Sequence, residues 1–134
     1  MQAVETPASA RAGGCRVLVV EDHAVTHVTM RQILSAAGHE VEAVGSLADA
    51  RLKLPFAQCL ILDLELPDGL GSDLLRELRQ QRLPVRVAVV TGTSDKALLA
   101  DVRALRPDAL FIKPFRPTEL LQWLDSAGPP ASHT

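Results

Sequence analysis

Five side chains that can take part in chemistry lie at the ends of short apolar runs in this sequence. They comprise three acids, one hydroxyl and one lysine: Glu21, Asp22, Asp63, Thr91 and Lys113. Carboxylates held close together raise each other's pKa, and a divalent cation between them removes that conflict. Oxygen ligands suit Mg²⁺ or Mn²⁺, which usually share their site with a phosphate group. The acids therefore predict a metal and phosphate site, provided that the fold brings them together.

Each of these side chains also has a simpler explanation when it is taken alone. Asp22 could cap a helix that begins near Ala24. A lysine such as Lys113 is more often a surface residue, and a threonine such as Thr91 is commonly a turn residue. The functional interpretation rests on their shared placement at the ends of apolar runs.

The apolar runs have the composition of strands in a parallel sheet. They are Val17–Val20, Val41–Val44, Cys59–Leu62, Val85–Val90 and Ala109–Ile112. Three of them lack the alternation of a half-buried strand, which indicates strands covered on both faces.

The segments between the runs have helical spacing, and their ends carry stop or cap residues. These are Gly38 after the first helix, Ser46 and Pro55 around the second, Ser94 before the fourth and Pro117 at the start of the fifth. The sequence thus predicts an α/β fold, (βα)5, with a doubly wound five-stranded parallel sheet. Ligands of such sheets bind at the carboxyl ends of the strands, where the five side chains are placed.

Composition narrows the expected function. The 134 residues predict one domain at 15–126, a disordered N-terminal arm at 1–14, and a disordered tail or linker at 127–134. The net charge of −2 and the aromatic content of 3% argue against direct nucleic-acid binding. No apolar run reaches the ~18 residues of a membrane span, and no signal peptide is recognised. We therefore expect a cytoplasmic protein without membrane contact.

The two cysteines, Cys15 and Cys59, are expected to remain free. If their strands are neighbours with Asp22 and Asp63 level, the cysteines are offset by about three residues, or roughly 10 Å. That separation exceeds the Cα–Cα reach of a disulfide, about 7 Å at most. Cys59 is predicted to be a buried apolar residue.

Four motifs, VLVVEDH, LILDLELPDGLG, VVTG and FIKPF, occur in an order and spacing that resemble the receiver domains of two-component response regulators. The resemblance covers about residues 15–126. It implies a flavodoxin-like sheet with the strand order 2-1-3-4-5. It also implies that the protein is a phosphoacceptor signalling domain, limited to Mg²⁺-dependent phosphorylation and dephosphorylation of itself, and not a general enzyme.

The resemblance assigns a role to individual residues. Asp63 is similar to the phosphoacceptor of the family, and Asp22 to a direct Mg²⁺ ligand with Glu21 beside it. The backbone carbonyl of Glu65 would complete the metal ligands. Lys113 is similar to the lysine that pairs with a phosphoryl oxygen.

Two further residues resemble the switch of the family. Thr91 is similar to the hydroxyl that closes onto the phosphoryl group, and Phe111 to the aromatic residue that moves with it. The implied donor is a histidine kinase or a histidine phosphotransfer domain. The implied output is a downstream protein that binds the surface of the fourth helix, fifth strand and fifth helix.

Two alternatives use the same residues. The first is an interaction domain of the receiver fold that works without phosphorylation. The second is a phosphatase, because Asp63-Leu64-Glu65 weakly resembles the D-x-D pattern of haloacid dehalogenases. The sequence also leaves open whether the chain is a free-standing regulator or a piece of a hybrid kinase or larger regulator.

Overall fold

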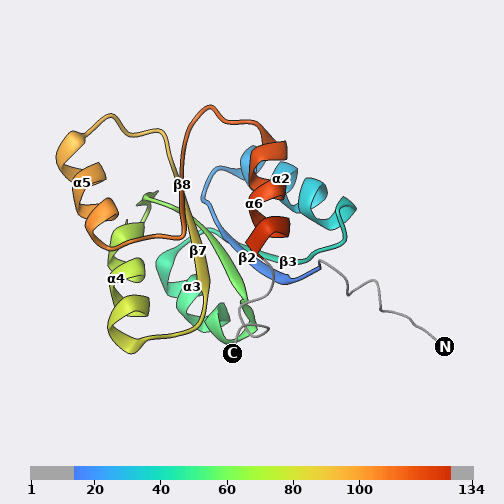
Figure 1. Cartoon of the computed structure of the whole chain (residues 1–134), viewed down its shortest axis with the longest axis horizontal. Coiled ribbons are helices and arrows are strands. Elements are labelled where there is room, and N and C mark those ends of the chain that lie inside the picture. Colours follow the sequence, from blue (N-terminus) through green and yellow to red (C-terminus); the bar gives the residue numbers. More distant parts are fainter. Residues whose placement is uncertain (1–13, 128–134) are drawn as a thin grey trace.

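The computed structural model describes residues 14–127 and confirms the predicted parallel sheet (Figure 1). Its strands are β2 (Arg16–Val20), β3 (Glu40–Val44), β4 (Cys59–Asp63), β7 (Arg86–Thr91) and β8 (Ala109–Ile112). They pair in the order β3-β2-β4-β7-β8, which is the predicted 2-1-3-4-5 in order of appearance. The predicted arm and tail lie outside the described residues, except at residues 14 and 127.

Helices cover both faces of the sheet, as the unbroken apolar runs predict. They are α2 (Ala24–Ala36), α3 (Leu47–Lys53) with the short helix η1 (Leu54–Phe56), α4 (Gly71–Gln81), α5 (Lys96–Ala104) and α6 (Pro117–Ala127). Helices α2 and α6 lie on one side of the sheet, and α3, α4 and α5 lie on the other (Figure 1). Within residues 14–127, no helix is both long and apolar enough to cross a membrane.

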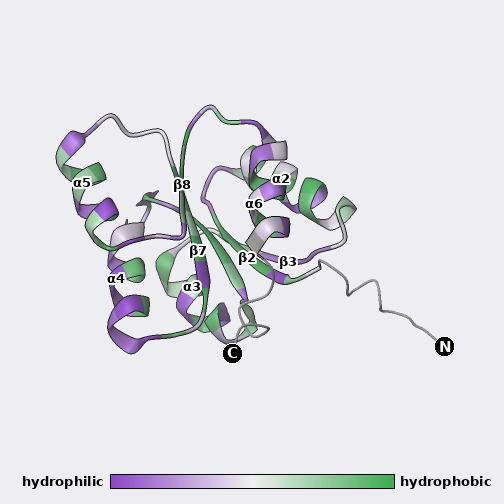
Figure 2. Ribbon diagram, in the orientation of Figure 1, coloured by the Kyte–Doolittle hydropathy of each residue, from purple (hydrophilic) through white to green (hydrophobic). Residues whose placement is uncertain are grey.

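Two aliphatic cores, one on each face of the sheet, follow from the alternation of side chains along the strands. Leu18 and Leu60 pack in the core under α3 and α4, while Val19 and Ile61 pack in the core under α2 and α6. All four are at most 2% exposed. Burying one such side chain stabilises the fold by about 1.5–3 kcal/mol, so the central strands anchor the domain. Figure 2 shows these strands largely green, with purple concentrated on the helices and loops.

Most helix ends match the sequence signals, with one correction. Ser46 caps α3 by accepting from the N–H of Asp49, and Pro117 is the first residue of α6. The predicted cap Ser94 is wrong, because Asp95 caps α5 and accepts from the N–H of Ala97 and Leu98. A carboxylate satisfies two free N–H groups and carries a negative charge at the positive end of the helix, so it replaces the hydroxyl here.

A short hairpin after β4 was not predicted as strands. Strands β5 (Glu65–Leu66) and β6 (Gly69–Leu70) pair antiparallel around Pro67 and Asp68. Asp68 lies in the turn of this hairpin, and its carboxylate accepts from the N–H groups of Leu47 and Ala48, at 2.8 and 3.0 Å. These hydrogen bonds lower the pKa of Asp68. The loop after Asp63 is therefore tied to the start of α3.

The expected separation of the cysteines is wrong, although both are free thiols as predicted. Val17 pairs with Cys59, so Cys15 precedes the level of Cys59 by two residues and not by three. Because side chains alternate along a strand, an even offset puts both thiols on the same face. Both belong to the core under α2 and α6, and their Sγ atoms are 3.6 Å apart.

Candidate functional site at the carboxyl edge of the sheet

The register of the strands places the acids and the lysine at one edge. Val20 pairs with Leu62, so the next residues, Glu21 and Asp63, are level at the ends of β2 and β4. On the other side of β4, Thr91 pairs with Ile112. The N–H of Lys113 then donates to the carbonyl of Thr91 at 2.8 Å. The aliphatic strands thus deliver these residues to neighbouring positions.

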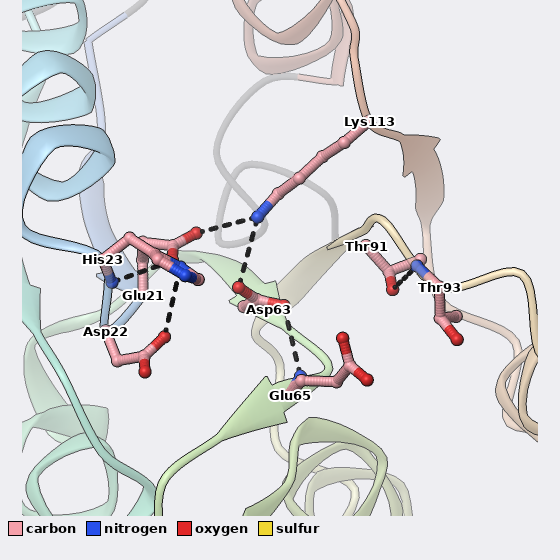
Figure 3. Close-up of polar contacts among 8 residues, drawn as sticks. All are labelled: Glu21, Asp22, His23, Asp63, Glu65, Thr91, Thr93 and Lys113. Carbon is pink, nitrogen blue, oxygen red and sulfur yellow. Dashed lines mark hydrogen bonds and ion pairs between the residues drawn. The ribbon is translucent and has the colours of Figure 1, made fainter.

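Lys113 connects two of the predicted acids directly (Figure 3). Its Nζ lies 3.2 Å from Glu21 Oε1 and 3.3 Å from Asp63 Oδ2. Burial lowers the pKa of Lys113, but the charges of Asp63 and Glu21 outweigh it and raise the pKa above its usual value. The two carboxylate side chains are only 5–6% exposed, whereas the lysine side chain is 30% exposed. A cation is therefore fixed between two carboxylates that water barely reaches.

Glu21 stays ionised because of its hydrogen bonds. Burial pushes its pKa upward, but the side chain and backbone N–H of His23 and the charge of Lys113 bring it below the usual value. His23 Nδ1 lies 2.9 Å from Glu21 Oε2, and its N–H donates to the same oxygen at 3.1 Å. His23, and not Asp22, is the N-cap of α2. Its contact with Glu21 was missed.

Asp63 has the opposite shift. Its burial raises its pKa, the charge of Glu21 adds to this, and neither the N–H of Glu65 nor the charge of Lys113 compensates fully. The N–H of Glu65 donates to Asp63 Oδ1 at 3.2 Å, so each carboxylate oxygen has one donor. An acid in a dry pocket with a perturbed pKa is typical of a functional site.

The acids form a cluster that fits a hard cation. Glu21, Asp22, His23 and Asp63 each offer one ligand atom within 4.8 Å of the others. Carboxylate oxygens are suitable ligands for Mg²⁺. Asp22 is exposed, so the cluster is open to solvent on its side and closed on the side of Glu21 and Asp63.

Thr91 is the last residue of β7, and Phe111 is the third residue of β8. Thr91 is fully buried, and its Oγ1 accepts from the N–H of Thr93 at 3.0 Å. In Figure 3 one dashed line marks the contact of this hydroxyl with Thr93, and another marks the contact of Lys113 with Asp63. Phe111 is partly buried, and its ring centroid is 5.4 Å from that of Phe115. Both residues lie near the carboxyl ends of their strands, but their side chains project from opposite faces of the sheet. Their switch roles remain predictions.

A doubly wound parallel sheet with acids and a lysine at its carboxyl edge defines a flavodoxin-like α/β protein. The family model of the response regulator receiver domain matches residues 17–125. The chain therefore belongs to the response regulator receiver domain family of two-component systems, whose general function is phosphoryl transfer.

Similar proteins agree with this assignment. The chain is 34% identical to the phosphate regulon transcriptional regulatory protein PhoB of Rhizobium meliloti over 79% of its length and 48% of that protein. It is 37% identical to the transcriptional regulatory protein GltR of Pseudomonas aeruginosa, over 82% and 47%. The chain thus spans about half the length of the curated relatives it matches.

A solved structure shows the same fold. The CheY-like response regulator receiver domain protein of Methanospirillum hungatei superimposes with a TM-score of 0.75 and 26% identity, over 84% of this chain and 98% of that one. The receiver domain of a putative LuxO repressor from Vibrio parahaemolyticus gives a TM-score of 0.73, also at 26% identity, over 84% and 91%.

Proposed function

We propose that Asp63 accepts a phosphoryl group from the phosphohistidine of a histidine kinase or a histidine phosphotransfer domain. The observation that carries this proposal is the position of the Asp63 carboxylate. It is buried, it is held by Lys113 Nζ and the Glu65 N–H, and it lies beside an acidic cluster. These are the groups needed to orient an acid as a nucleophile and to neutralise a phosphoryl group.

The step is a transfer between two nucleophiles. An Asp63 oxygen forms a bond to phosphorus while the bond from phosphorus to the donor imidazole nitrogen breaks, and the nitrogen keeps that electron pair. Because the moving group spreads its charge over three oxygens, catalysis depends mainly on positioning and charge stabilisation. Lys113 supplies a fixed positive charge at the site, and the Thr91 hydroxyl, which accepts from the Thr93 N–H, would donate its own O–H to a phosphoryl oxygen.

Glu21, Asp22 and Asp63 would hold Mg²⁺ or Mn²⁺ with the backbone carbonyl of Glu65. The bound cation would supply positive charge that lets three acids and a phosphoryl group share one site. Glu65 itself is exposed on β5, so its side chain adds negative charge at the rim.

The output surface is proposed to be α5, β8 and α6, which follow Thr91 along the chain. Phe111 pairs with Val90, the residue before Thr91, and packs in the core under α2 and α6, so the two side chains project from opposite faces of the sheet. A movement of Thr91 would therefore reach Phe111 through the backbone of β7 and β8. The chain has one tryptophan, Trp123 on α6, which packs in the core under α2 and α6 beneath the guanidinium of Arg86 at 4.3 Å. Its fluorescence therefore reports on this surface. We place this domain in the cytoplasm, as a protein-binding module without direct nucleic-acid contact.

Incubating the whole chain with a small phosphodonor such as acetyl phosphate and Mg²⁺ tests the proposal. We expect a single base-labile phosphoryl group on the peptide that contains Asp63, with a change in Trp123 fluorescence. Asp63→Asn should remain unmodified. A wild-type chain that neither gains a phosphoryl group nor responds to beryllofluoride would favour the phosphorylation-independent interaction domain. The haloacid dehalogenase alternative is set aside, because the receiver family match covers the same residues.

The donor protein is proposed to dock on the exposed start of α2. Val25 and Val28 of this helix are 79% and 54% exposed. Val25 lines a depression of about 350 Å³ together with Lys113, Pro114 and Phe115. Any donor must bring its phosphorus to the Asp63 carboxylate, and this apolar surface shares Lys113 with that site.

Replacing Val25 by serine is therefore expected to slow transfer from a phosphorylated histidine phosphotransfer domain by about tenfold, the effect of losing ~1.4 kcal/mol of contact. Phosphorylation by acetyl phosphate should not change. Leu52→Ser is the matched control, since Leu52 is 78% exposed on α3 but lies outside this depression. Equal slowing in both variants, or in neither, would contradict the proposed docking surface.

A further inference from the structure

The opposite edge of the sheet carries a second cluster of reactive side chains. Cys15 directly precedes β2, Cys59 is the first residue of β4, and His39 directly precedes β3. Cys15 Sγ lies 3.6 Å from Cys59 Sγ and 3.6 Å from His39 Nδ1. The three residues are 6%, 0% and 5% exposed. Phosphoryl transfer at Asp63 does not use this cluster, because it lies at the amino ends of the strands.

The two thiols are not equivalent. The hydrogen bond between the two thiols lowers the pKa of Cys15, burial opposes this effect, and His39 and Arg86 add to the lowering. The same hydrogen bond, together with burial, raises the pKa of Cys59. Because the thiolate is the reactive form of cysteine, these directions favour Cys15 as the nucleophile and Cys59 as the thiol that keeps its proton.

Access to the pair is also unequal. A surface depression of about 250 Å³ is lined by Gly14, Cys15, Arg16, Gly38, Glu40 and Gln58. Cys15 is in its lining, whereas Cys59 is fully buried behind it. A small reagent that enters the depression therefore reaches Cys15 first.

The backbone at Cys15 can shift enough to bring the two sulfur atoms together. A disulfide would require the sulfur atoms to approach from 3.6 Å to about 2.05 Å. Cys15 lies outside the paired strand, and its N–H donates to His39 Nδ1 at 3.2 Å rather than to a neighbouring strand. Its carbonyl accepts from the N–H of Glu40. Closing the gap therefore strains one end of β2 and leaves the pairing of Val17 with Cys59 in place.

We propose that Cys15 and Cys59 form an oxidisable dithiol that a hydroperoxide converts to an intramolecular disulfide. The Cys15 thiolate attacks the peroxide, a sulfur–oxygen bond forms, the oxygen–oxygen bond breaks, and the leaving oxygen takes up the proton that Cys15 has released. The Cys59 sulfur then attacks the sulfur of the sulfenic acid, and water leaves with the Cys59 proton. The two thiols lose two electrons, and the peroxide is reduced to an alcohol (or water) and a second water.

The cluster is better suited to oxidation than to metal binding. Within residues 14–127, the groups that converge closely enough to hold a metal ion are those around Glu21 and Asp63, and the thiol pair is not among them. Two sulfur atoms in contact, with only one reachable from outside, instead provide an attacking thiol and a resolving thiol.

Oxidation of the native, reduced chain with hydrogen peroxide tests the proposal. The two cysteines are the only ones in the sequence, so the products are unambiguous. After alkylation, we expect the wild type to lose two hydrogen atoms in intact mass, to lose both alkylation sites, and to yield a linked Cys15–Cys59 peptide. Dithiothreitol should restore both sites. Two remaining alkylation sites, a stable sulfenic acid at Cys15, or disulfide-linked dimers instead would each overturn the proposal.

Single substitutions separate the two roles. Cys59→Ala should stop at a sulfenic acid on Cys15, which dimedone traps, and Cys15→Ala should leave Cys59 unmodified under native conditions. Both variants should still be phosphorylated on Asp63 by acetyl phosphate, which shows that the fold is intact. If either variant fails to fold, the linked peptide of the wild type alone decides. Rapid peroxide modification of Cys59 in Cys15→Ala would contradict the assigned order.

Discussion

Replacing Gly71 by alanine is expected to destabilise the domain by about 1–3 kcal/mol, the usual cost of forcing extra volume into a packed interior. Gly71 is the buried first residue of α4, and its N–H donates to the carbonyl of Leu64 at 2.7 Å. A Cβ built there would overlap the backbone carbonyl oxygen of Asp63 and would lie 3.1 Å from Leu62 Cγ. Strand β4 cannot move aside, because β2 and β7 pair with it on both sides.

Helix propensity acts in the opposite direction and is too small to compensate. Alanine is favoured over glycine by about 1 kcal/mol in a helix interior, and less is gained at a helix start. The clash also pushes on the backbone of Asp63, the proposed phosphoacceptor. We therefore expect slower phosphorylation of Asp63 by acetyl phosphate in addition to a lower urea midpoint.

Gly45→Ala is the matched control for this substitution. Gly45 also borders the site, but a Cβ there meets nothing closer than 3.9 Å, at Asp22 Cα and the carbonyl of Glu21. A change of less than about 0.5 kcal/mol is expected, as for an ordinary surface substitution. If urea unfolding gives Gly71→Ala the stability of Gly45→Ala, the close packing of α4 on Asp63 is wrong.

The candidate site could be predicted from the sequence because one rule of parallel sheets governs the position of its residues. Apolar runs identify the strands, and in a parallel sheet all their carboxyl ends meet at one edge. Glu21, Asp63 and Lys113 each follow a run directly, so small errors in helix boundaries did not affect their placement. The fold and the meeting of these three residues therefore required no knowledge of side-chain conformation.

The features that were missed depend on contacts between distant parts of the chain. Asp68 binds the start of α3 about twenty residues away, and no local spacing encodes that contact. The thiol pair was missed through an error of one residue in the register of β2 and β4, which changes the face on which a side chain lies. The direction of the Thr91 hydroxyl is a rotamer choice, set by the N–H of Thr93, and strand patterns do not predict rotamers.

Asp63→Asn is expected to remove phosphorylation completely and yet to raise the melting temperature. Glu21 and Asp63 share the single cation of Lys113, so one of the two buried carboxylates is poorly compensated. The raised pKa of Asp63 expresses this cost, with burial as its main cause. A carboxyl group with a raised pKa contributes stability below its unfolded pKa of ~3.9, and that contribution is lost as the pH rises through the folded pKa. At neutral pH the ionised Asp63 therefore destabilises the fold. A neutral amide at this position removes the cost of burying that charge.

In a domain of this size, the melting temperature should rise by about 4 °C for each kcal/mol gained in the free energy of unfolding. The rise should be measured by thermal unfolding without divalent cations, and it should shrink below about pH 4, where Asp63 is protonated in both states. Adding Mg²⁺ should stabilise the wild type more than the variant, because a ligand that binds only the folded state stabilises it by mass action. A lower melting temperature for Asp63→Asn would show that the contact with Lys113 outweighs the cost of burial.

Asp68→Asn is the matched control, because the same chemical change is expected to have the opposite sign. Hydrogen bonds from Leu47 and Ala48 lower the pKa of Asp68, so its ionised form stabilises the fold above its unfolded pKa. That contribution is lost as the pH falls through the folded pKa. The variant should melt below the wild type at neutral pH, should approach it in acid, and should still be phosphorylated on Asp63. A higher melting temperature for Asp63→Asn and a lower one for Asp68→Asn would show that the two aspartates have different roles. The ionised Asp68 would stabilise the fold, whereas the ionised Asp63 would serve the proposed phosphorylation at the expense of stability.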